Sequence, residues 1–122
     1  MLFAKRTFYG AGIYGLVVLL PLYFTESMVG QQYPPAVTHA EYYYGFVGVA
    51  IAWQFLFFVI GSDPVRYRKA MLPAIVEKVT YGVAAWVLHF QGRIPPVALA
   101  GGCIDLLLMT LFIVSFLKTP RA

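Results

Sequence analysis

The sequence predicts an all-α protein: an integral membrane bundle of four antiparallel transmembrane helices in up-down-up-down order. Three observations lead to this fold class. Hydrophobic residues make up 61% of the 122 residues and charged residues only 11%, whereas soluble domains carry roughly 45–50% and about 25%. The apolar residues fall into four long runs, and turn-forming residues separate these runs. This composition excludes a soluble enzyme and a disordered chain.

The four apolar runs define the expected membrane spans. Each has about the 20 residues that an α-helix needs to cross a hydrocarbon core roughly 30 Å thick. Spanning strands would alternate apolar and polar side chains, which these runs do not do. We therefore predict one transmembrane domain over 1–122, with helices over residues 8–24, 42–61, 71–90 and 97–117. The first run should be retained rather than cleaved as a signal peptide, because no Ala-x-Ala site follows it.

Turn-forming residues mark the connections between the runs. Ser62, Asp63 and Pro64 follow the second run. Gly92, Pro95 and Pro96 follow the third. Asp63 can cap the segment after it, and glycine with proline favours a tight turn. Short connections of this kind predict antiparallel neighbours.

The distribution of basic residues predicts the orientation in the membrane. Loops that face the cytoplasm carry an excess of Lys and Arg. Seven basic residues fall on one predicted side and only Arg93 on the other, so we expect both termini and the second connection to be cytoplasmic, in a cell (inner) membrane. The seven are Lys5, Arg6, Arg66, Arg68, Lys69, Lys118 and Arg121. They form no stripe with aromatic residues, so we expect no nucleic-acid partner.

Polar residues inside the runs are the candidate functional positions, because an ionisable group in a bilayer span is costly. A rise of about 1.5 Å per residue places five of them in one layer roughly 10 Å from the cytoplasmic ends, with Asp105 about one turn deeper. The five are Tyr14, Gln54, Glu77, Lys78 and Thr110. The candidates for ligand binding or proton handling are Glu77, Asp105, Gln54, Lys78, Tyr14 and Trp53.

Glu77 and Lys78 are adjacent, so their side chains leave a helix about 100° apart and should not form a clean pair with each other. Lys78 either extends its apolar stem to the cytoplasmic interface or pairs with Asp105. Glu77 is shorter, so we expect it to matter more, either as a structural hydrogen-bonding group facing Gln54 or Tyr14 or as a proton carrier.

Asp105 follows Gly101 and Gly102 at helical spacing. Small residues allow another helix to approach closely, so this face of the fourth span should point inward. The carboxyl then either pairs with Lys78 or a tyrosine hydroxyl, or it takes part in proton handling or ligand binding.

The remaining singled-out residues have mainly structural interpretations. Glu41 and His89 are expected near the outer interface. His89 could ligate a haem only with a second membrane histidine, and His39 lies in the outer connection, so we expect no metal and no cofactor. Trp53 should pack with its N–H bonded internally, and the single cysteine, Cys103, should be a small buried core residue.

One resemblance adds to these observations. Glu41 opens a glycine-bearing second span, Glu41-x-x-x-Gly45-x-x-Gly48, in a chain with four spans and both termini predicted inside. This layout resembles small bacterial four-helix membrane proteins of the DoxX-like kind. The resemblance implies a membrane protein that is associated with quinones in a few cases, and it carries over no catalytic residue.

The expected function is therefore that of an accessory subunit or of a binder of a lipophilic ligand such as a quinone or a lipid. The usual nucleophile, metal and phosphate-binding motifs are absent, which favours a non-catalytic role. Two alternatives remain open: a proton-shuttling, isomerase-like enzyme for a lipid-soluble substrate, and a dimeric proton-coupled carrier. The expected partners are membrane lipid, a lipophilic small molecule, and a second copy or a larger membrane complex.

Overall fold

The computed structural model describes residues 2–121, and every regular element within that range is helical. Four helical segments are long and apolar enough to cross a membrane, which indicates a multi-pass membrane protein. This confirms the all-α class and the number of spans. In chain order the elements are α1 (Leu2–Leu19), η1 (Leu20–Phe24), α2 (Glu26–Gln32), α3 (Ala40–Ser62), η2 (Arg68–Ala70), α4 (Met71–Phe90) and α5 (Pro96–Lys118).

The element ends follow the hydropathy pattern closely, except in the first forty residues. α4 coincides with the predicted range 71–90, and α3 and α5 exceed their predicted ranges by one or two residues at each end. α1 starts six residues before the predicted span because Lys5 and Arg6 interrupt the apolar run but do not oppose a helix. The short helix α2 was not predicted, and its first turn carries Glu26, whose charge suits a helix N-terminus.

Gly92 closes the turn between α4 and α5. Its φ of 69° lies in the left-handed region that glycine adopts without strain. The N–H of Gly92 donates to the carbonyl of His89, and the N–H of Arg93 donates to that of Leu88, each at 2.9 Å. These two bonds form a Schellman motif, which satisfies carbonyls at the end of α4.

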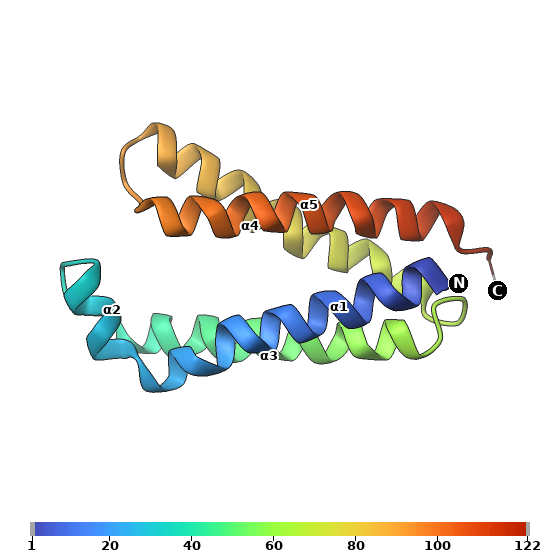
Figure 1. Ribbon diagram of the computed structural model, residues 1–122, viewed down its shortest axis with the longest axis horizontal. Helices are drawn as coiled ribbons and strands as arrows, with labels where there is room; N and C mark the ends of the chain where they lie inside the picture. Colours follow the sequence, from blue (N-terminus) through green and yellow to red (C-terminus); the bar gives the residue numbers. More distant parts are fainter. Residues whose placement is uncertain (1, 122) are drawn as a thin grey trace.

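The helices associate as two pairs, α1 with α3 and α4 with α5 (Figure 1). Glycines allow close approach within both pairs. Gly12 of α1 lies under the ring of Phe58, and Gly102 of α5 lies against the methyl group of Ala85. Small residues at such contacts let helix backbones pack tightly in a membrane, where apolar side chains gain little by leaving lipid.

The two pairs meet at one end of the molecule only. In Figure 1 they converge where both termini and the α3–α4 connection lie, and they diverge toward the opposite end. At the closed end, the ring of Phe8 stacks on Phe112 at a centroid distance of 4.2 Å, and Phe57 meets Phe112 edge-on at 5.1 Å. Helices α1, α3, α4 and α5 all contribute to this aromatic core, which comprises Ala4, Phe8, Ala11, Phe57, Ile60, Met71, Ala74 and Phe112.

Arg68 fastens the end of α5 to the α3–α4 connection. Its Nε donates to the carbonyls of Phe116 and Thr119, at 3.1 and 2.8 Å, and its guanidinium lies 3.7 Å from the centroid of the Phe116 ring. A cation at a helix C-terminus is favourable because the terminal carbonyls carry partial negative charge.

The glycine contact between α4 and α5 generates a first prediction. A Cβ on Gly102 would lie 2.4 Å from the Cβ of Ala85, whereas a Cβ on Gly101 would meet nothing closer than 3.8 Å. Gly102→Ala should therefore lower the free energy of unfolding by about 1–3 kcal/mol, as overpacking does. The matched change Gly101→Ala should leave stability unchanged or raise it by up to about 1 kcal/mol.

The measurement is equilibrium unfolding in mixed dodecyl maltoside and SDS micelles. If the two alanine variants are equally stable, then Gly102 does not set the spacing of α4 and α5.

Candidate functional site

A groove of about 340 Å³ opens between α3 and α4. α3 and α4 belong to different helix pairs and have few direct contacts with each other. The walls of the groove are mainly aromatic and aliphatic, and Glu77 is the only charged residue among those that line it. The lining residues are Phe46, Val49, Ala50, Trp53, Glu77, Thr80 and Tyr81.

Next to the groove, Glu77, Lys78 and Asp105 form one cluster, here called the ion group. Nζ of Lys78 lies 3.4 Å from Oε2 of Glu77 and 3.5 Å from Oδ1 of Asp105. The Lys78 side chain is 5% exposed, and those of Glu77 and Asp105 are 20% and 15% exposed. In hydrocarbon, charged groups of this kind pair with one another because no water solvates them. The ion group therefore holds two carboxylates around one ammonium.

Lys78 also connects the ion group to the aromatic core. Its Nζ lies 5.2 Å from the centroid of the Phe57 ring, within the range of a cation–π interaction. The lysine thus reaches α5 through Asp105 and α3 through Phe57.

Two expectations about Lys78 are settled by this geometry. The side chain does not extend to the membrane surface; it is buried and pairs with Asp105, which was the other alternative. The expectation that it would form no clean pair with Glu77 holds for hydrogen bonding, but the two charged ends do lie within ion-pair distance. The four-carbon stem of lysine is long enough to bend back toward the preceding residue, so the 100° between their Cβ directions does not separate the charged ends.

Glu77 has no hydrogen bond to Gln54 or Tyr14 in the part of the chain that the structure describes. Its Oε2 is buried and lacks a partner in hydrogen-bonding geometry, although Nζ of Lys78 is 3.4 Å away. The contact with Lys78 is therefore a charge–charge contact without an aligned hydrogen bond. The expected structural bond to Gln54 or Tyr14 is therefore wrong: the Gln54 amide lies against Gly15 of α1, whereas Glu77 borders the groove between α3 and α4.

Gln54 belongs to the interface between α1 and α3. Its Nε2 donates to the carbonyl of Ala50 at 2.8 Å, and its buried Oε1 has no hydrogen-bonding partner. A Cβ on Gly15 of α1 would lie only 1.9 Å from this oxygen, so the amide occupies the space that a side chain at Gly15 would need. Gln54 is thus buried, as expected, but outside the ion group.

The predicted polar layer is therefore only partly a cluster. Tyr14 is half-buried on α1, and Thr110 is exposed on α5 with its hydroxyl donating to the carbonyl of Leu106. The estimate from residue count concerned the position along each helix, and it contained no information on the direction in which each side chain leaves its helix. The structure brings together Glu77, Lys78 and Asp105 alone.

Two further residues, Trp53 and Cys103, differ from their sequence-based expectations. Trp53 lines the groove and packs on the aromatic core, 6.5 Å from Phe57 by ring centroids. The internal hydrogen bond expected for its N–H is not present among the described residues. Cys103 is exposed, so the expectation of a buried cysteine is wrong: α5 turns Gly102 toward α4, and the next residue points about 100° away.

The two interfacial candidates lie far from the ion group along their helices. Glu41 is exposed at the start of α3, and its Oε1 lies 3.2 Å from Nδ1 of His39. His89 is exposed in the last turn of α4 and meets Trp86 edge-on, at 5.8 Å between ring centroids. No group of three or more residues able to hold a metal ion is found within residues 2–121.

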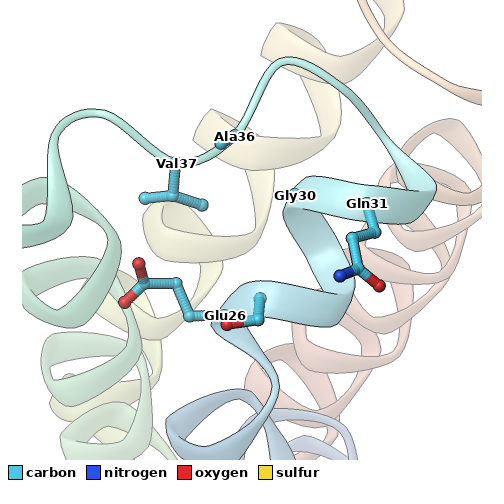
Figure 2. Close-up of a pocket in the computed structure, with 6 residues that line it drawn as sticks. Glu26, Gly30, Gln31, Ala36 and Val37 are labelled. Carbon is cyan, nitrogen blue, oxygen red and sulfur yellow. The ribbon is translucent and has the colours of Figure 1, made fainter.

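A second, smaller hollow lies outside the bundle, between α2 and the loop that follows it. Figure 2 shows Glu26 and Val37 on one side of this hollow and Gln31 extending away from it. Its volume is about 280 Å³, and Ser27, Gly30 and Ala36 complete its lining. This hollow could not be predicted from the sequence, because helix α2 was not predicted. Its lining is exposed or half-buried, and it adjoins no ion pair of the described residues.

Comparisons with protein-family models, with curated proteins and with solved structures return no match for this chain. The assignment of function therefore depends on the groove and the ion group.

The burial of Lys78 generates the second prediction. Lys78→Met removes the only ammonium of the ion group and leaves two carboxylates facing each other. Breaking a buried charge pair by removing one partner typically costs about 3–5 kcal/mol, and we expect a loss of that order in the free energy of unfolding. Lys78→Arg should restore most of it.

Unfolding in mixed micelles measures this loss, with Lys69→Met in the exposed η2 turn as the control. Parental stability of Lys78→Met would show that the ion group does not hold α4 to α5.

Proposed function

We propose that this protein binds a lipophilic small molecule with a polar head group in the groove between α3 and α4. The observation that carries the proposal is the lining of the groove: apolar and aromatic walls with a single carboxylate, Glu77, at the ion group. Small-molecule sites are typically concave and mostly apolar, with a few placed polar groups that orient the ligand. A volume of about 340 Å³ falls at the lower end of the range for such sites.

The position of the groove supports a ligand that is dissolved in the membrane. Its walls belong to two helices long and apolar enough to span a bilayer. Phe46 and Val49 on the α3 wall are more than half exposed, so the groove is open along its side. A hydrophobic molecule can therefore enter laterally from the hydrocarbon.

The arrangement favours binding over proton-shuttling catalysis. An isomerase-like enzyme needs a proton donor and a proton acceptor that face the same substrate. Of the ion group, Glu77 borders the groove, whereas Lys78 and Asp105 do not belong to its lining. We therefore favour an accessory or ligand-binding role, in agreement with the DoxX-like layout.

Filling the groove tests this function. Val49→Phe should occupy part of the groove, since Val49 lines it and is 62% exposed. The matched control Val59→Phe makes the same change at an exposed position of α3 outside the lining. After gentle extraction in dodecyl maltoside, mass spectrometry should find a lipophilic molecule with the parent and with Val59→Phe, and at least fivefold less with Val49→Phe. Equal amounts in all three would contradict the proposal.

We also propose that the four spans form an antiparallel bundle in a bacterial inner membrane, with both termini in the cytoplasm. The support is the position of seven basic residues. They lie in the first turns of α1, in the α3–α4 connection, and at or just after the last residue of α5. Loops with an excess of Lys and Arg stay in the cytoplasm.

Cysteine labelling tests this topology. In a Cys103→Ser background, Gln32→Cys should react with an impermeant thiol reagent in intact cells, and Lys69→Cys should react only after the membrane is opened. The reverse pattern would invert the orientation, and reaction of both in intact cells would rule out the four-span arrangement.

A further inference from the structure

We propose that the ligand of the groove is an organic cation: a lipophilic molecule with an amine or quaternary onium centre that lies against Glu77. This inference rests on the proposed function, because it names the chemical class that the same groove selects.

The first argument is the charge of the ion group. Two carboxylates and one ammonium leave a net charge of −1 when all three are ionised. An unbalanced charge within hydrocarbon is costly. While the groove is empty, a proton on one carboxyl balances the negative charge. A cation in the groove would balance it instead, and that proton would be released to water. An anionic ligand would double the imbalance.

The second argument is the position of Glu77. Lys78 lies between the two carboxylates, but its side chain is only 5% exposed, and Asp105 does not line the groove. Glu77 is the member of the ion group that a ligand can reach. Its Oε2 is buried beside Lys78, and the Glu77 side chain as a whole is 20% exposed, so a ligand in the groove would meet the exposed part of this side chain.

The third argument is the chemistry of the walls. Phe46, Trp53 and Tyr81 line the groove, and the faces of aromatic rings attract cations. The hydroxyl of Thr80 donates to the carbonyl of Glu77, and that of Tyr81 is directed at the carbonyl of Ala98, at 3.4 Å, so the indole N–H of Trp53 is the one lining side-chain donor without a partner among the described residues. A quinone offers only acceptor oxygens, which would face the Glu77 carboxylate. The groove therefore suits a cation better than a neutral carbonyl compound.

Calorimetric titration in dodecyl maltoside micelles tests the inference with three probes. Tetraphenylphosphonium is a permanent cation, while triphenylphosphine oxide and decylubiquinone are neutral lipophiles. We expect the parent to bind tetraphenylphosphonium at least tenfold more tightly than either neutral probe. Glu77→Gln should weaken binding of the cation at least tenfold and leave the neutral probes unaffected. The matched control Glu41→Gln removes an exposed carboxylate outside the groove and should change nothing.

Size-exclusion chromatography and circular dichroism establish that each variant is folded. If Glu77→Gln does not fold, the relative affinities of the parent for the cation and for the neutral probes decide whether the inference holds. Equal affinity for cation and neutral probes, or full binding of the cation by folded Glu77→Gln, would overturn the inference. If a neutral probe binds tightly and Val49→Phe abolishes this binding, the proposed function would be supported but the cation inference would not. Failure of all three probes to bind would remove both.

Discussion

The structure depends on one asymmetric constraint: the two helix pairs are joined at a single end, by the aromatic core. Phe8, Phe57 and Phe112 come from α1, α3 and α5, and their rings fill the space at the closed end. No comparable cluster of buried side chains among the described residues joins the pairs at the other end. The groove between α3 and α4 is the direct result, since two long pairs held at one end diverge along the rest of their length.

The ion group adjoins the aromatic core. Lys78 contacts Phe57 of the aromatic core on one side and two carboxylates on the other. Charges inside a span pair with one another within protein packing, and here the ammonium of Lys78 offsets the charge of one of the two carboxylates. The same packing leaves Glu77 at the border of the groove. Two adjacent residues of α4 therefore have different positions: Lys78 is buried in the ion pairs, and Glu77 also borders the groove.

Much of the fold, but less of the site, could be predicted from the sequence. The length of an apolar run determines the length of a span, so α4 agrees with its predicted range. α1 begins before its predicted range because Lys5 and Arg6 interrupt the apolar run but not the helix. Depth within a span follows from residue count, but the direction in which a side chain leaves its helix depends on which helices pair. Gln54 therefore lies beside Gly15 and not in the ion group, Thr110 is exposed, and Cys103 faces outward.

The attachment of Arg68 to the end of α5 has a mechanical consequence. It ties the closed end more firmly, through two carbonyls and a ring, so that this end acts as a fulcrum for the helix pairs. A helix of twenty residues is about 30 Å long. A tilt of about 5° around the fulcrum would thus displace the far end of α4 by roughly 2–3 Å over that length. A rearrangement of a few rings at the closed end would therefore change the width of the open side by a distance of that order.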